Sequence, residues 1–139
     1  MTLSIRNQLP GTVTAIQPGE VMTTVKLRLH GGQDLTAAIT KESAEDLALA
    51  PGSSVRALVK STEVSVATHR VEGLSIRNQL DGAVVGLTTG AAMASVRISV
   101  PGGELTAAIT KDAATGLGLF VGSDVVALIK ATDVSLATA

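Results

Sequence analysis

The stretch LSIRNQL occurs twice in the chain, at residues 3–9 and 74–80, and places one arginine among small hydrogen-bonding side chains. Arginine, serine and asparagine side chains all carry N–H or O–H donors, and the arginine adds a positive charge. A tetrahedral oxyanion presents only acceptor oxygens, so its binding shell should consist of such donors with one or two cations. The repeated stretch therefore predicts part of an oxyanion site in each half of the chain.

The two copies belong to a longer internal repeat. Residues 3–32 match residues 74–103, and LTAAITK at 35–41 recurs at 105–111. The differences between the copies show which polar residues the protein kept: Arg28 aligns with Ser99 and Arg56 with Val126. The cations kept as identical residues are Arg6 and Arg77, Lys41 and Lys111, and Lys60 and Lys130.

Small donors accompany these cations. Thr40 directly precedes a predicted helix, whose free N–H groups and positive dipole end favour anions. The donors in question are Ser4 and Ser75, Asn7 and Asn78, Thr40 and Thr110, and Ser61, which is replaced by Ala131 in the second copy.

A purely structural role for the cations is the alternative. Arg6 could pair with a carboxylate across a subunit interface, and Lys60 could be a solvated lysine at the end of a strand. Surface ion pairs contribute little to stability, so this alternative explains the verbatim repeat less well. The anion interpretation is therefore favoured.

Other chemistries find little support in the sequence. His30 aligns with Pro101 and His69 lies between the copies, so neither belongs to a repeated metal or acid–base site. No paired carboxylates are kept in the manner of a catalytic site, and there are no cysteines. The sequence predicts a protein that is not an enzyme, with no metal ligands and no catalytic cofactor.

Composition limits the partners and the compartment. The net charge is −1, which argues against non-specific nucleic-acid binding. No apolar run is long enough to span a bilayer, and the N-terminus lacks the features of a signal peptide, so we expect a cytoplasmic protein with no membrane partner. Phe120 is the one aromatic residue. A small aliphatic core of this kind commonly gains stability by association, so we expect an oligomer.

The repeat also predicts the fold. Two modules are expected at residues 2–68 and 73–139, joined by a short linker. Each should contain three strands, a helix at KESAEDLALAPG (41–52) or its counterpart, and two further strands. This order suits an all-β chain of two tandem OB-like five-stranded barrels, each with one short helix and a long first strand bent near Gly11.

Within LSIRNQL, strand alternation makes a prediction for each side chain. Leu3, Ile5 and Leu9 should face the barrel or an interface. Ser4, Arg6 and Asn7 should share a polar side, and Gln8 has no assigned role beyond interface hydrogen bonding.

The strings SIRNQLPGTV, LTAAITKES and ALVKSTEVSVAT resemble the Mop (molybdopterin-like) domain of the molbindins, which are small molybdate- and tungstate-binding proteins. The resemblance covers essentially the whole chain, as two domains in tandem. It implies OB-like barrels assembled as a homotrimer, with anions bound between neighbouring barrels. It also implies a site type near the threefold axis, which these strings do not assign.

The same resemblance implies a set of site residues. The first shell would comprise Ser4, Arg6, Asn7, Thr40, Ser43, Lys60 and Ser61. The second would comprise Ser75, Arg77, Asn78, Thr110, Lys130 and the backbone N–H of Ala131. In the second shell Ala113 and Ala131 replace Ser43 and Ser61, so hydroxyl contacts are lost and the affinities are expected to differ.

The function expected from this resemblance is reversible binding of molybdate or tungstate for molybdenum storage and homeostasis. The alternative is a molybdate-dependent sensor or regulatory module that acts through a protein partner. A nucleic-acid-binding OB protein would need stacking aromatics and a basic groove, and an enzyme would need a repeated nucleophile or base. The sequence shows neither.

Overall fold

The computed structural model describes residues 3–138, and the predicted module limits at residues 2 and 139 lie outside them. The first repeat has the expected order of three strands, a helix and two strands. Its elements are β1 (Asn7–Pro18), β2 (Met22–Leu29), β3 (Asp34–Thr40), α1 (Lys41–Asp46), β4 (Ser54–Val59), the 3-10 helix η1 (Ser61–Glu63) and β5 (Val64–Ala67). The second repeat contains β6 (Asn78–Thr89), β7 (Met93–Val100), β8 (Gly103–Thr110), α2 (Lys111–Gly116), β9 (Asp124–Ile129), η2 (Ala131–Asp133) and β10 (Ser135–Thr138).

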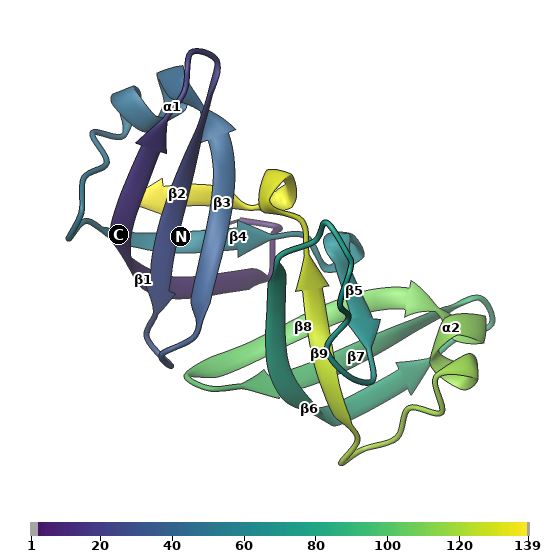
Figure 1. Cartoon of the computed structure of the whole chain (residues 1–139). Helices are drawn as coiled ribbons and strands as arrows, with labels where there is room; N and C mark the ends of the chain where they lie inside the picture. Colours follow the sequence, from purple (N-terminus) through teal and green to yellow (C-terminus); the bar gives the residue numbers. More distant parts are fainter. Residues whose placement is uncertain (1–2, 139) are drawn as a thin grey trace.

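The strands form two curled five-stranded sheets, which confirms the expected pair of OB-like barrels. Their strand orders are β10-β4-β1-β2-β3 and β5-β9-β6-β7-β8. The last strand of each repeat therefore completes the sheet of the other repeat. In Figure 1 the yellow end of the chain crosses to the purple and blue barrel, and teal β5 lies in the green one.

The exchanged strands pair in equivalent registers. Leu136 of β10 lies opposite Ala57 of β4, and Val66 of β5 lies opposite Ala127 of β9. The residues leading into these strands, Val64 and Val134, are each 2% exposed. One hydrophobic cluster contains buried residues of both repeats, so the two barrels share a continuous core.

Period-two alternation sets the inner face of each barrel. In β2 every second residue is buried, and the predicted face of Val25, Leu27 and Leu29 is confirmed. The core consists of aliphatic side chains, while Phe120 is exposed. The irregularity in the β1 register falls between Val13 and Ala15 and not at Gly11, which was the expected point of bending.

The helix of each repeat is shorter than expected. Helix α1 ends at Asp46, and the prediction that it continues to Pro51 was wrong. Ala48 adopts a positive φ of 51°, and the N–H groups of Leu47 and Ala48 bond back to Ser43 and Glu45, so the helix closes there. The expected cap is confirmed, since the Thr40 hydroxyl accepts a hydrogen bond from the Ser43 N–H at 3.1 Å.

The turns of the β2–β3 and β7–β8 hairpins touch each other across the two barrels. A Cβ on Gly31 would overlap the carbonyl of Pro101, and one on Gly102 would lie 2.6 Å from the Gly31 nitrogen. Nearby, the Gln33 side chain accepts from the Asp81 N–H at 3.1 Å. The Gly-Gly hairpins are therefore contact points between barrels as well as turns.

Among residues 3–138 there is no helix with the length and apolar character needed to cross a membrane.

The strand exchange predicts that damage to one repeat appears in the sheet of the other. We expect Leu136→Asp in β10 to speed amide exchange in β4 of the first repeat, because a charge replaces a side chain packed on the shared core. Losing the burial of a Leu side chain costs roughly 1.5 kcal/mol. This free energy raises the equilibrium constant for local opening about tenfold. Val66→Asp is the reciprocal variant and should speed exchange in β9. Hydrogen–deuterium exchange measures both, and a Leu136→Asp effect restricted to β9 would contradict the exchange.

The hairpin contact predicts opposite effects for two glycine substitutions. Gly31→Ala should lower the free energy of unfolding by about 1–3 kcal/mol, because the new Cβ has no room against the Pro101 backbone. Gly116→Ala is the control: it lies in α2 with nothing within 4 Å of its Cβ position, and should raise stability by about 0.5–1 kcal/mol. Urea unfolding followed by circular dichroism compares them, and equal effects would rule out the tight contact.

Candidate functional site

The predicted arginine of each repeat and one of its predicted lysines lie at the same end of the sheet. In the antiparallel pair of β1 and β4, Asn7 lies opposite Val59. Arg6 directly precedes Asn7, and Lys60 directly follows Val59. The two cations therefore lie next to each other along the backbone at the end of this strand pair. The second repeat reproduces this arrangement, since Asn78 lies opposite Ile129 between Arg77 and Lys130.

These cations form no salt bridge within the described part of the chain. The salt bridges found among residues 3–138 are Arg28–Asp34 at 2.6 Å, Arg97–Glu104 at 3.1 Å and Arg70–Asp81 at 3.7 Å. None of them includes a cation that is identical in both repeats. Within one protomer, the repeated cations are therefore available to an anion.

The asparagines of the repeated stretch connect the two barrels. Asn7 is 2% exposed, donates to the Thr106 carbonyl at 2.8 Å and accepts from the Thr106 N–H at 2.8 Å. Asn78 makes the same pair of bonds to Thr36, at 2.7 and 2.8 Å. The expectation that Asn7 shares a polar side with Arg6 was wrong, because β1 alternation turns Asn7 inward with Leu9 while Arg6 stays exposed. Among residues 3–138, each asparagine amide nitrogen donates one hydrogen bond, and its second hydrogen has no partner there.

The glutamine that follows each asparagine holds the segment before it. Gln8 donates to the Ile5 carbonyl at 3.0 Å, and Gln79 donates to the Ile76 carbonyl at 3.2 Å. These bonds fix the backbone that carries Arg6 or Arg77. The sequence had assigned Gln8 no role of this kind.

The remaining hydrophobic residues of the stretch are less buried than expected. Leu9 is 5% exposed and belongs to the core, whereas Leu3 is 37% exposed and Ile5 is half-buried. Leu3 thus faces solvent in the protomer.

The helix-start residues of the first repeat line a cavity with a volume of about 560 Å³. Thr40 and Ser43 stand on one side of it, with the Thr40 hydroxyl donating to Ser43 Oγ at 2.8 Å. Thr132 and Ser135 of the second repeat stand on the other side. Because β10 is exchanged, this cavity combines hydroxyls of both repeats.

Lys60 lines a smaller cavity of about 190 Å³ at the place where the barrels meet. Ile5 and Glu63 of the first repeat share it with Thr132, Asp133 and Ser135 of the second. The cavity is lined by two carboxylates and one ammonium group, so its lining carries no net positive charge. Lys60 can therefore favour an anion only together with Arg6. Ser61 begins η1 directly after Lys60, and Ala131 begins η2 after Lys130.

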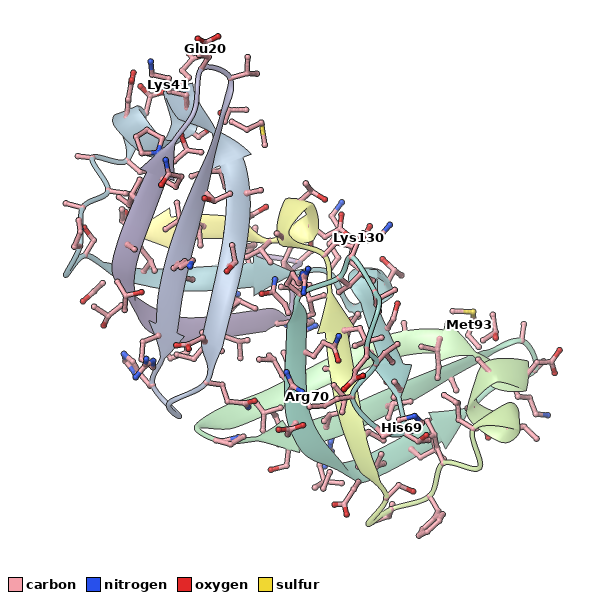
Figure 2. The ribbon with its side chains drawn as sticks, in the orientation of Figure 1. Glu20, Lys41, His69, Arg70, Met93 and Lys130 are labelled. Atoms are coloured by element: carbon pink, nitrogen blue, oxygen red, sulfur yellow. The ribbon has the colours of Figure 1, made fainter. Side chains whose placement is uncertain are left out.

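Within one protomer, the residues of the predicted first shell therefore do not all line the same cavity. Lys60 and the Thr40–Ser43 pair line different cavities, although Thr132 and Ser135 line both. Figure 2 shows Lys130 where the barrels meet, while Lys41 lies at the outer end of the first barrel, near Glu20. In the second repeat, the Thr110 hydroxyl accepts from the Ala113 N–H at 3.1 Å and so acts as a helix cap.

Two hydroxyl residues at the site, Thr132 and Ser135, were missed by sequence reasoning. A signal was present, because Thr62 and Ser65 recur as Thr132 and Ser135 in the final segment of the repeats. Their position beside the first-repeat helix depends on the strand exchange, which the order of elements does not reveal.

Comparisons with known proteins agree with this architecture. The TOBE domain family matches residues 3–66 and 74–136. The structure of the cytoplasmic molybdate-binding protein ModG, with molybdate bound, superposes with a TM-score of 0.95 at 42% identity and covers 100% of both chains.

Curated relatives match over nearly all of this chain. The molybdenum-pterin-binding protein MopB of Rhodobacter capsulatus is 43% identical over 136 residues, which is 96% of this chain and 50% of MopB. The molybdenum transport protein ModE of Azotobacter vinelandii is 40% identical over 138 residues, which is 99% of this chain and 51% of ModE. The chain thus spans about half the length of these relatives. It belongs to the TOBE domain family, with two copies of the domain.

The asparagine contacts predict that Asn7 is structural. We expect Asn7→Ala to lower the free energy of unfolding of the anion-free protein by about 2–4 kcal/mol, because the Thr106 N–H and C=O lose their partners inside the protein. Gln8→Ala is the matched control and should cost about 1 kcal/mol or less, since one bond to Ile5 is lost. Urea unfolding measures both, and an unchanged stability for Asn7→Ala would contradict this role.

Proposed function

We propose that this chain binds molybdate or tungstate reversibly and serves in molybdenum storage and homeostasis in the cytoplasm. The observation that carries the proposal is that Arg6 and Lys60, and likewise Arg77 and Lys130, lie at adjacent strand ends and form no salt bridge among residues 3–138. The likeness to ModG, whose structure contains molybdate, supports the choice of anion.

Binding would use charge-assisted hydrogen bonds and no covalent bond to the metal. In the first shell, Arg6 and Lys60 supply charge, and Ser4, Ser61, Thr40 and Ser43 supply hydroxyl or backbone donors. Asn7 contributes its second amide hydrogen while holding Thr106. In the second shell Ser75, Arg77, Asn78, Thr110, Lys130 and the Ala131 N–H take the corresponding roles.

We propose that the shells are completed in a homotrimer. Lys60 and the Thr40–Ser43 pair line separate cavities in one protomer. Both cavities are open to solvent, and Met22 at the edge of the larger one is 42% exposed. A neighbouring barrel seated there would bring further donors to each cation pair and would cover this apolar surface.

A binding role without catalysis fits the site. Among residues 3–138 there is no group of three or more His, Cys, Asp or Glu side chains arranged to hold a metal ion. The net charge of −1 gives no reason to propose nucleic acid as a partner of this chain. A regulatory module is the second candidate, since the ModE relative contains a segment that matches this chain.

Titration calorimetry with molybdate, tungstate and sulfate tests the proposal. Arg6→Ala and Arg77→Ala should each weaken molybdate binding at their own class of site by roughly tenfold to a hundredfold, because a charge-assisted bond contributes about 1.5–3 kcal/mol. Arg28→Ala is the matched control, since Arg28 is paired with Asp34 and should leave affinity unchanged. Unchanged molybdate affinity in the Arg6→Ala/Arg77→Ala double variant would overturn the residue assignment.

The assembly has a separate test. We expect the mass in solution to correspond to a trimer, with several molybdenum or tungsten atoms per trimer after loading. A monomer that binds molybdate at full affinity would contradict the shared shell while leaving the anion-binding function intact.

A further inference from the structure

A third cavity, of about 390 Å³, lies between the linker that joins the repeats and the segment that leads into β6. Arg70 and Arg77 both line it, together with Glu72 and the half-buried Val71 and Leu74. Arg77 belongs to the proposed oxyanion shell, but Arg70 has no place in it. Because the linker joins the two repeats, this cavity occurs once per chain.

The linker is held in place by Gln79. The Gln79 side chain accepts from the Val71 N–H at 2.9 Å and donates to the Val71 carbonyl at 2.9 Å. Arg70 donates to the Gln79 backbone carbonyl at 3.1 Å. These three bonds give the cavity a fixed wall, whereas Gln8, the counterpart of Gln79, donates to Ile5 alone among the described residues. Figure 2 shows Arg70 beside the strands of the second barrel.

The cavity is rich in donors. Arg70 forms an exposed salt bridge with Asp81 at 3.7 Å, which offsets part of its charge, whereas Arg77 has no salt-bridge partner among residues 3–138. Within the same residues, the N–H groups of Glu72, Gly73 and Leu74 have no hydrogen-bond partner. Gly73 has a φ of 69°, and turns with a left-handed residue gather successive N–H groups around an anion.

The size and remaining lining of the cavity indicate what kind of anion it accepts. A volume of about 390 Å³ falls in the range of small-molecule sites and exceeds what a bare oxyanion fills. Val71 and Leu74 offer apolar contact. Glu72 accepts hydrogen bonds but repels negative charge, so the ligand must present hydroxyl donors to it and direct its anionic group to the arginines.

We propose that this linker cavity binds a phosphorylated sugar or polyol. Arg70, Arg77 and the linker N–H groups hold the phosphate, and Glu72 accepts from the hydroxyls. The two sites share Arg77, so the sugar phosphate and molybdate should compete for this residue, while Arg70 and Glu72 belong to the linker cavity alone.

Calorimetry with glucose 6-phosphate, glucose and inorganic phosphate tests this proposal on the full chain. We expect glucose 6-phosphate to bind at one site per chain, inorganic phosphate to bind more weakly and glucose not to bind. Arg70→Ala should weaken glucose 6-phosphate binding about tenfold, as expected for one charge-assisted contact in an open site. Arg97→Ala is the matched control, because Arg97 lies in the same repeat and pairs with Glu104.

Glu72→Ala separates the sugar phosphate from a simple anion. It should weaken glucose 6-phosphate, which loses an acceptor for its hydroxyls, and strengthen inorganic phosphate, which loses a repulsive charge. Equal binding of glucose 6-phosphate by wild type and Arg70→Ala, or no binding by the wild type, would overturn the proposal. Molybdate titration of Arg70→Ala should match the wild type, so loss of the linker site is distinguishable from failure of the molybdate function.

Discussion

The exchange of the fifth strand between the repeats is the constraint on which the rest of this molecule depends. Each barrel lacks an edge strand until the other repeat supplies it, so neither sheet is complete without both halves of the chain. The exchange places Val64 and Val134 in the core and joins the two barrels through one hydrophobic cluster. A chain with one aromatic residue and a core of small aliphatic side chains thereby buries more apolar surface than two separate modules could.

Polar contacts between the barrels follow from the same arrangement. With β5 and β10 exchanged, Asn7 reaches Thr106 and Asn78 reaches Thr36, and each bond pair satisfies a backbone N–H and C=O on the partner barrel. The hairpin turns at Gly31 and Gly102 meet closely enough to exclude any side chain. These directional contacts fix the relative position of the barrels, which burial of aliphatic groups alone would leave less defined.

A rigid junction is also what an oxyanion shell requires. Arg6 and Lys60 extend from adjacent strand ends, and their positions are set by the β1–β4 ladder. Gln8 and Gln79 fix the backbone just before that ladder. The two halves of the protein nevertheless differ: the linker brings Arg70 near Arg77 in the second repeat, and the losses at Ala113 and Ala131 remove hydroxyls there. The two repeats thus present unequal surroundings to the proposed anion.

The sequence by itself determined the strands and the repeat, because these depend on local patterns. Alternation in β2 predicted its buried face, and Thr40 predicted the helix cap, while the donor set of retained arginines and lysines stays a prediction. Tertiary structure alone decided which repeat completes which barrel, because β5 and β10 are equivalent in sequence and either could pair with either β4 or β9. It also decided that Asn7 turns inward and that Thr132 and Ser135 stand beside Thr40, since these contacts join residues far apart in the chain.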